Sequence, residues 1–171
     1  MESEFIGEIM GKNIDFDELD EYMNILNGLS DKDEILDDMK EIVYEGAAVM
    51  ADAIRDEIQG ANVTDNPKNG MTRKDKEDLL DGFGVSPIQT TNDDANVKMG
   101  FSGYSKTNTW KGKSGKQEKI PIPVVARTCL SGTSWHKKDD FVGRAVRKSK
   151  EKSLQAMGDK FDNILEDKFK K

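Results

Sequence analysis

The chain has 171 residues, a formal net charge of −7 and 35% charged residues, as expected for a single α+β domain with much exposed surface. It contains no run of about 18 apolar residues, so we expect no membrane-spanning segment. The acidic N-terminus also lacks the pattern of a secretory signal. Cys129 is the single cysteine, which excludes an internal disulfide and predicts folding in a reducing cytoplasm.

The charge is unevenly distributed. Residues 1–60 hold 18 of the 33 acidic residues and only 4 of the 26 basic ones, so residues 61–171 are net basic. Two poles of opposite sign would suit head-to-tail contacts between identical copies. A long acidic helix that is simply well solvated explains the pattern equally well.

The N-terminal half predicts two helices. Apolar residues spaced along 15–27 predict a short helix that Gly28 ends, so we expect 1–28 to form a separate N-terminal segment and 29–171 the main domain. The second helix runs over 31–59. It begins after Ser30 and carries apolar residues at three- and four-residue steps: Ile35, Met39, Ile42, Val43, Ala47, Met50, Ile54 and Ile58.

The middle of the chain predicts short elements. A turn cluster at 66–70 precedes a short helix from Thr72, its N-cap, to Leu80. Residues 85–91 and 96–101 have the character of two strands joined by a polar turn.

The second half combines a polar segment with two helices. Residues 102–119 are rich in Gly and Lys and show no periodicity, which predicts a long flexible loop or arm. Residues 124–130 suit either a strand or a short helix, and we favour the helix. A last helix is predicted over 139–169, with Phe141, Leu154 and Phe161 on its apolar stripe. The predicted fold is therefore α+β, with two long helices packed on a small antiparallel β-sheet and a long Lys/Gly-rich loop.

No pattern of catalytic or metal-binding residues stands out. The one histidine, His136, lies seven positions from Cys129, and no pair of soft ligands has zinc spacing. We expect His136 at the surface or in an interface, and Cys129 as a buried, inert thiol within an apolar run. His136 could approach Cys129, but the sequence indicates no third group. We therefore expect no enzyme activity, no metal and no cofactor.

A nucleic-acid function is the alternative that the residues themselves suggest. Residues 103–150 hold 12 basic and 3 acidic residues, with Tyr104, Trp110 and Trp135 interleaved. Lysines can neutralise phosphates, and aromatic rings can stack on exposed bases. The overall acidity and the absence of a base-reading motif favour instead a basic surface that meets an acidic neighbouring copy.

Three segments carry a resemblance to a known family. They are the helix segment 42–51, the strand 97–101 and, most specifically, the block 126–135 followed by Phe141 and Ala145. Together they resemble the tail-completion (head–tail joining) family of lambdoid and Gram-positive tailed phages and prophages.

The resemblance implies a structural virion protein of the neck, assembled in the host cytoplasm. It would form a ring, expected to be a hexamer, that completes the head-proximal end of the tail and helps join it to the head. A monomer in dilute solution is compatible with this. Its partners would be other copies, the tail terminator and the head connector, with DNA only passing through the ring and no membrane contact. The tail terminator itself is an alternative assignment.

Tryptophan and arginine dominate the energetics of protein interfaces. We therefore expect the contacts between copies to involve an exposed, mainly basic set: Trp110, Lys111, Lys113, Arg127, Trp135, Arg144 and Arg147.

Overall fold

The structure is a computed structural model that describes residues 32–90, 95–111 and 115–169. The chain divides into two units, residues 1–37 and 38–171. The first unit contributes only the start of one helix to the described residues, and all contacts below lie within the second. The predicted helix over 15–27 and Ser30, after which the second helix was predicted to begin, lie outside the described residues.

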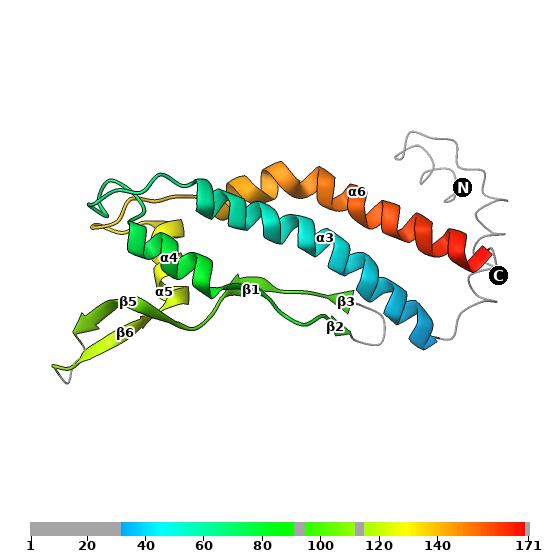
Figure 1. The fold of residues 1–171 in the computed structure, drawn as a ribbon, viewed down its shortest axis with the longest axis horizontal. Helices are drawn as coiled ribbons and strands as arrows, with labels where there is room; N and C mark the ends of the chain where they lie inside the picture. The colour runs from blue at the N-terminus through cyan, green and yellow to red at the C-terminus, as the bar shows by residue number, and fades with distance from the viewer. Residues whose placement is uncertain (1–31, 91–94, 112–114, 170–171) are drawn as a thin grey trace, which may run out of the picture. The chain divides into compact units, whose positions relative to one another are not determined.

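The predicted α+β class is confirmed: the described residues form four helices and three small antiparallel ladders (Figure 1). In chain order the elements are α3 (Lys32–Gly60), α4 (Arg73–Gly82), β1 (Phe83–Val85), β2 (Gln89–Thr90), β3 (Ala95–Asn96), β4 (Met99–Phe101), β5 (Tyr104–Lys111), β6 (Gln117–Pro121), α5 (Ile122–Ser131) and α6 (Phe141–Phe169). The ladders pair β1 with β4, β2 with β3, and β5 with β6.

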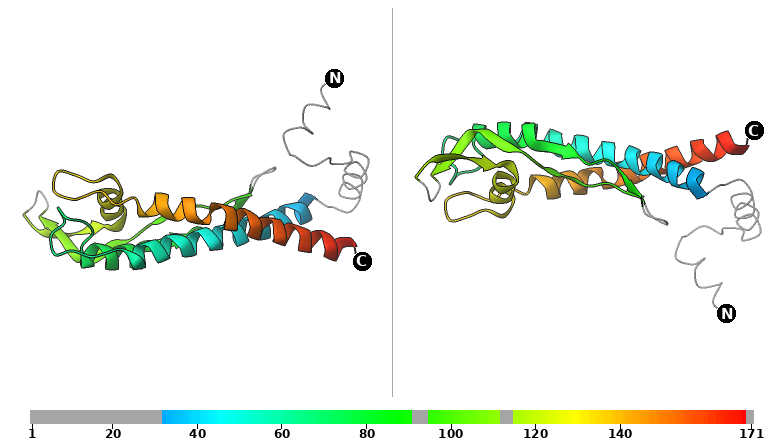
Figure 2. Two further views of the ribbon diagram at one scale, coloured as in Figure 1. Left: turned by 90° about the horizontal axis from the view of Figure 1, so that it is seen from above. Right: turned by 90° about the horizontal axis from the view of Figure 1, so that it is seen from below.

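The two long helices lie side by side and run antiparallel (Figures 1 and 2). Glu41 near one end of α3 pairs with Lys160, whereas Glu57 near the other end pairs with Arg144. Between these pairs the hydroxyl of Ser153 donates a hydrogen bond of 2.8 Å to the carbonyl of Gly46. A Cβ atom at Gly46 would lie 2.6 Å from the sulfur of Met157, so the absence of a side chain there allows the close approach.

The core forms where α3, α4, α5 and the first turns of α6 meet. Ile54 and Ile58 are buried in this core, which confirms that they belong to the inward face predicted for α3. Its buried members are Ala51, Ile54, Ile58, Met71, Leu79, Phe83, Val125, Ala126, Cys129, Phe141 and Ala145. The predicted stripe of α6 is correct at Phe141 but wrong at Leu154 and Phe161, which are exposed, because α6 extends beyond the part of the core that could cover them.

The short helix α4 follows the sequence prediction closely. Thr72 is its N-cap: the Thr72 hydroxyl accepts a hydrogen bond from the Asp75 backbone, and the Asp75 carboxylate accepts one from the Thr72 backbone. This reciprocal capping box satisfies donors that the first turn of a helix leaves unpaired.

The two strands predicted for 85–91 and 96–101 form one interrupted hairpin. Phe83 pairs with Phe101 in the β1–β4 ladder, and Gln89 pairs with Asn96 in the β2–β3 ladder. The ladder breaks at Pro87 because proline has no N–H to donate. The centroid of the Phe101 ring lies 5.4 Å from the centroid of the Phe83 ring. It lies 6.1 Å from the centroid of the Phe141 ring, which it meets edge to face. These two contacts attach the hairpin to the core.

The predicted loop over 102–119 is wrong for most of its length. Residues 104–111 and 117–121 form the antiparallel hairpin β5–β6. Both faces of β5 are mostly exposed, so its side chains show none of the apolar–polar alternation that identifies a half-buried strand.

The predicted helix over 124–130 is confirmed as α5, and the last helix begins at Phe141 rather than at Asp139. Gly132 ends α5 with a positive φ of 71°, and a Cβ atom there would lie 3.0 Å from Lys138. Glycine is therefore the residue that this turn requires.

Candidate protein interface

The β5–β6 hairpin presents large and basic side chains to solvent. Trp110 is 57% exposed, and Tyr104, Lys111 and Lys119 are exposed on the same two strands. Tryptophan is enriched among the residues that carry most of the binding energy of protein interfaces. Lys113, which was predicted beside them, lies outside the described residues.

A bulge fixes the base of this hairpin against α4. Tyr104 pairs with Pro121, and Thr109 pairs with Lys119. Between these two pairs β5 runs for five residues and β6 for only two, so the extra residues of β5 form the bulge. Within the bulge the buried hydroxyl of Ser105 accepts hydrogen bonds from the backbone N–H groups of Thr107 and Asn108. The bulge also directs the amide of Asn108 to the carboxylate of Asp78, at 2.7 Å. The hairpin is therefore anchored at its base, while its outer half stays exposed.

A tight turn separates the side chains of Trp135 and His136. The backbone N–H of Thr133 donates to the carbonyl of His136 at 2.8 Å, and this closes a four-residue turn. Trp135 is 62% exposed and His136 is 5% exposed. Trp135, which was predicted as a partner contact, is thus exposed. The prediction of His136 at the surface or in an interface is wrong for this chain, because the turn directs its ring inward.

The three predicted arginines differ in their surroundings. Arg127 is exposed on α5. The Arg144 guanidinium contacts Glu57 at 2.8 Å and Asp139 at 2.7 Å, and its hydrogen bonds to Glu57 and then Asp139 raise the pKa of Arg144. Arg147 lies 3.3 Å from Asp140. Arg144 is thus largely engaged inside the chain, whereas Arg127 is directed to solvent.

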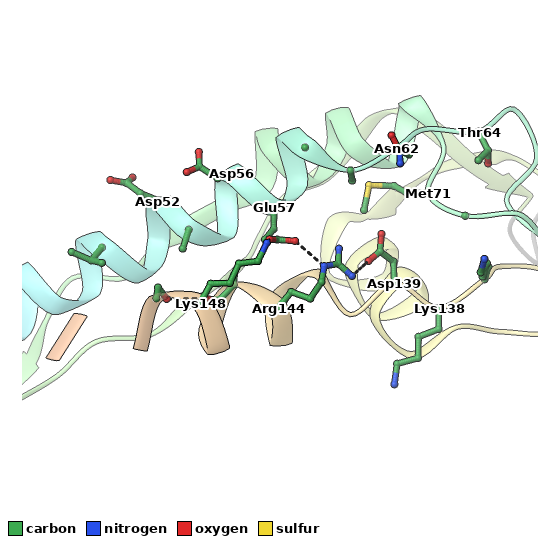
Figure 3. Close-up of a pocket in the computed structure, with 18 of the residues that line it drawn as sticks. Asp52, Asp56, Glu57, Asn62, Thr64, Met71, Lys138, Asp139, Arg144 and Lys148 are labelled. Carbon is green, nitrogen blue, oxygen red and sulfur yellow. Dashed lines mark hydrogen bonds and ion pairs between the residues drawn. The ribbon is translucent and has the colours of Figure 1, made fainter. Parts of the chain in front are cut away.

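A groove of about 1130 Å³ lies between α3 and α6 and the loops beside them, and Figure 3 shows its charged lining. Asp52, Asp56 and Glu57 come from α3, whereas Arg144 and Lys148 come from α6. Hydrogen bonds from Lys148 and Arg144 hold the pKa of the Glu57 carboxyl below its ordinary value. Part of the opposite charge that the sequence divides between its two halves is therefore neutralised within one chain.

Asp75, Cys129 and His136 form a largely buried polar cluster. The Cys129 sulfur lies 3.7 Å from Nε2 of His136, and the same Nε2 lies 3.4 Å from Oδ2 of Asp75. Cys129 is confirmed as buried, at 0% exposure, and burial raises the pKa of its thiol to about 12. A thiol that stays protonated and covered is unsuited to nucleophilic attack. No local pattern in the sequence indicated that Asp75 would join the cluster.

Among the helices of the described residues, none combines the length and the hydrophobicity that a bilayer-spanning segment requires. The chain matches no family model, no curated protein and no solved structure. The resemblance to tail-completion proteins therefore stays a prediction.

Proposed function

We propose that this chain is a structural subunit of a phage head–tail interface, a ring component that completes the head-proximal end of the tail and helps join it to the head. In this proposal the β5–β6 hairpin is the docking arm, which contacts a neighbouring copy or an adjacent ring. The observation that carries the proposal is the exposed Trp110 on a basic hairpin that projects from an anchored base.

The hairpin has the properties of an element that gains stability on docking. A two-stranded ribbon is at best marginally stable alone, and each of its strands leaves an unpaired edge. The base is held by the bond from Asn108 to Asp78, but the outer half, with Trp110 and Lys111, has no core behind it. Burial of a tryptophan is a common anchor of protein interfaces.

The acceptor for such a basic arm is an acidic face on the next copy. Glu45 and Asp56 are exposed on α3, and neither sits in the inward-facing set. A basic arm at one place and an acidic face at another form a heterologous pair of patches, which closes into a ring when the rotation between copies allows it. The resemblance supplies the expected hexamer and the expected partners, the tail terminator and the head connector.

A nucleic-acid-binding function is the second candidate, because the same hairpin places lysines beside aromatic rings. Tyr104, Lys106, Trp110 and Lys119 are all exposed there, which is the combination that binds single strands by stacking and phosphate contacts. Lys106 lies 2.6 Å from Asp81, so part of this charge is already offset within the chain.

The decisive test is Trp110→Ala, with Phe161→Ala as the matched control because Phe161 is also an exposed aromatic, on α6. We expect Trp110→Ala to weaken docking by about 2 kcal/mol or more, roughly 30-fold. Electron microscopy of particles made with this variant should show separate heads and tails, whereas Phe161→Ala particles should be normal. Normal necks with Trp110→Ala would exclude the hairpin as the arm.

A salt titration of binding to single-stranded DNA separates the two candidates. A structural subunit should bind weakly at physiological salt, and Trp110→Ala should leave that binding unchanged. Tight binding that falls steeply with salt, and that Trp110→Ala weakens, would favour the nucleic-acid function.

A further inference from the structure

We propose that Asp75, Cys129 and His136 form a binding site for one divalent transition-metal ion, with zinc as the best match. One ligand atom from each of the three residues lies within 4.8 Å of the others. They come from α4, from α5 and from the turn before α6. The inference is independent of the phage assignment, because it rests only on this buried geometry.

The distances fit a tetrahedral ion. Zinc bonds to sulfur at about 2.3 Å and to nitrogen or oxygen at about 2.0–2.1 Å, so tetrahedral angles place N and S about 3.6 Å apart and N and O about 3.3 Å apart. The structure has 3.7 Å from Cys129 Sγ to His136 Nε2 and 3.4 Å from that Nε2 to Asp75 Oδ2. The remaining sulfur–oxygen pair lies within 4.8 Å, so it needs to close by at most about 1.2 Å.

The imidazole of His136 is oriented as a ligand. Its Nδ1 lies 2.8 Å from the backbone carbonyl of Lys137, and because a carbonyl can only accept, Nδ1 carries the proton. With its proton on Nδ1, the ring can present the lone pair of Nε2, the atom that faces Cys129 and Asp75, to an ion. A second-shell carbonyl that fixes the tautomer in this way is the usual companion of a metal-bound histidine.

The Asp75 carboxylate is held in place as well. Its Oδ2 accepts hydrogen bonds from the backbone N–H of Thr72 at 3.0 Å and from the Thr72 hydroxyl at 2.6 Å. Such outer bonds restrict a ligating carboxylate to one orientation. The capping box of α4 therefore also positions a ligand.

The surroundings carry negative charge that a cation would offset. Asp75 is 15% exposed, and Asp78, one turn along α4, is buried. Asn108 donates to Asp78 and lies 3.4 Å from Asp75, but it is neutral. Across the described ranges, no lysine or arginine forms an ion pair with either carboxylate; Lys106 pairs with Asp81 and interacts with Asp78 only electrostatically. Buried carboxylates are costly without a cation nearby.

The donor set indicates the class of metal. A thiolate, an imidazole and a carboxylate are together borderline-soft, which suits zinc better than magnesium or calcium. On binding, the Cys129 thiol releases its proton to solvent and its sulfur bonds to the ion. Within the described residues three side chains contribute, so a water molecule would complete four-coordination. The ion would tie α4, α5 and the turn before α6 together.

The test uses the full chain, reduced and freed of metal, titrated with cobalt(II) as a spectroscopic probe for zinc. We expect saturation at one equivalent, a near-ultraviolet thiolate-to-cobalt charge-transfer band, visible bands typical of tetrahedral cobalt, and displacement by zinc. Absence of these bands in the wild-type chain would overturn the proposal.

Variants assign the ligands. Cys129→Ser should abolish the charge-transfer band, and Asp75→Asn should weaken cobalt binding at least tenfold. The control Asp81→Asn, on the exposed side of the same helix, should bind as the wild type does. Far-ultraviolet circular dichroism of the metal-free variants checks folding. If Cys129→Ser does not fold, Asp75→Asn decides, and unchanged affinity in that variant contradicts the site.

Discussion

The α3–α6 pair and the β5–β6 hairpin use charge in opposite ways. Along the helix pair, acidic residues of α3 meet basic residues of α6, as Glu41 does with Lys160 and Glu57 with Arg144 and Lys148. On the hairpin, Lys111 and Lys119 are exposed. Net charge along a sequence therefore does not show which charges serve a partner, because part of the imbalance is neutralised inside the fold.

The largest expected difference between these two regions is in stability. Phe141 is fully buried and contacts Phe101 edge to face, so Phe141→Ala should lower the free energy of unfolding by about 3–5 kcal/mol. Trp110→Ala on the hairpin should change it by no more than about 0.5 kcal/mol. Urea denaturation followed by circular dichroism measures both. Equal losses would mean that the hairpin belongs to the core.

The junction between the hairpin and the helices should be sensitive to added volume. A Cβ atom at Gly82 would lie 2.6 Å from Ile122 and 2.7 Å from the carbonyl oxygen of Ser102, whereas Gly84 has open space around it. We expect Gly82→Ala to lower the free energy of unfolding by about 1–3 kcal/mol. Gly84→Ala should change the same free energy by less than about 0.5 kcal/mol. Thermal unfolding of the two variants checks this, and a neutral Gly82→Ala would show that α5 shifts easily.

The smallest effect concerns the ion pairs between the helices and depends on pH. The folded-state pKa of Glu57 lies below its ordinary value of 4.5, so its stabilisation is complete above about pH 4.5 and is lost as the pH falls through the folded pKa. Because Arg144 and Lys148 are partly exposed, Glu57→Gln should cost only about 1 kcal/mol at pH 7.

That difference should shrink as the pH falls below 4.5. The control Glu77→Gln, on the exposed side of α4, should follow the wild type at every pH. Unfolding free energies measured across pH 3–7 provide the comparison. A constant difference for Glu57→Gln would mean that packing, rather than the ion pair, accounts for the loss.

The sequence predicted the elements that have a buried face or a local signal. The spacing of Ile54 and Ile58 identified α3, and Thr72 as N-cap marked the start of α4. The β5–β6 hairpin was missed because neither of its faces is buried, so only the β-forming character of residues such as Thr109 pointed to a strand. Its backbone pairing, rather than a side-chain pattern, makes it a strand.

The buried cluster was missed for a different reason. His136 stands among polar residues in the sequence, and its burial depends on the turn that begins at Thr133. Asp75 lies 61 residues away from it along the chain. A contact between residues so distant leaves no local signal in a single sequence, so it becomes visible only once α4 and α5 are packed together.

The placement of the two tryptophans has an optical consequence. The chain has two, Trp110 and Trp135, and each is more than half exposed. Their indole emission in the folded chain should already resemble that of indole in water, so intrinsic fluorescence is a poor indicator of unfolding. The same property makes it a sensitive indicator of any encounter that covers either ring, and no added label is needed.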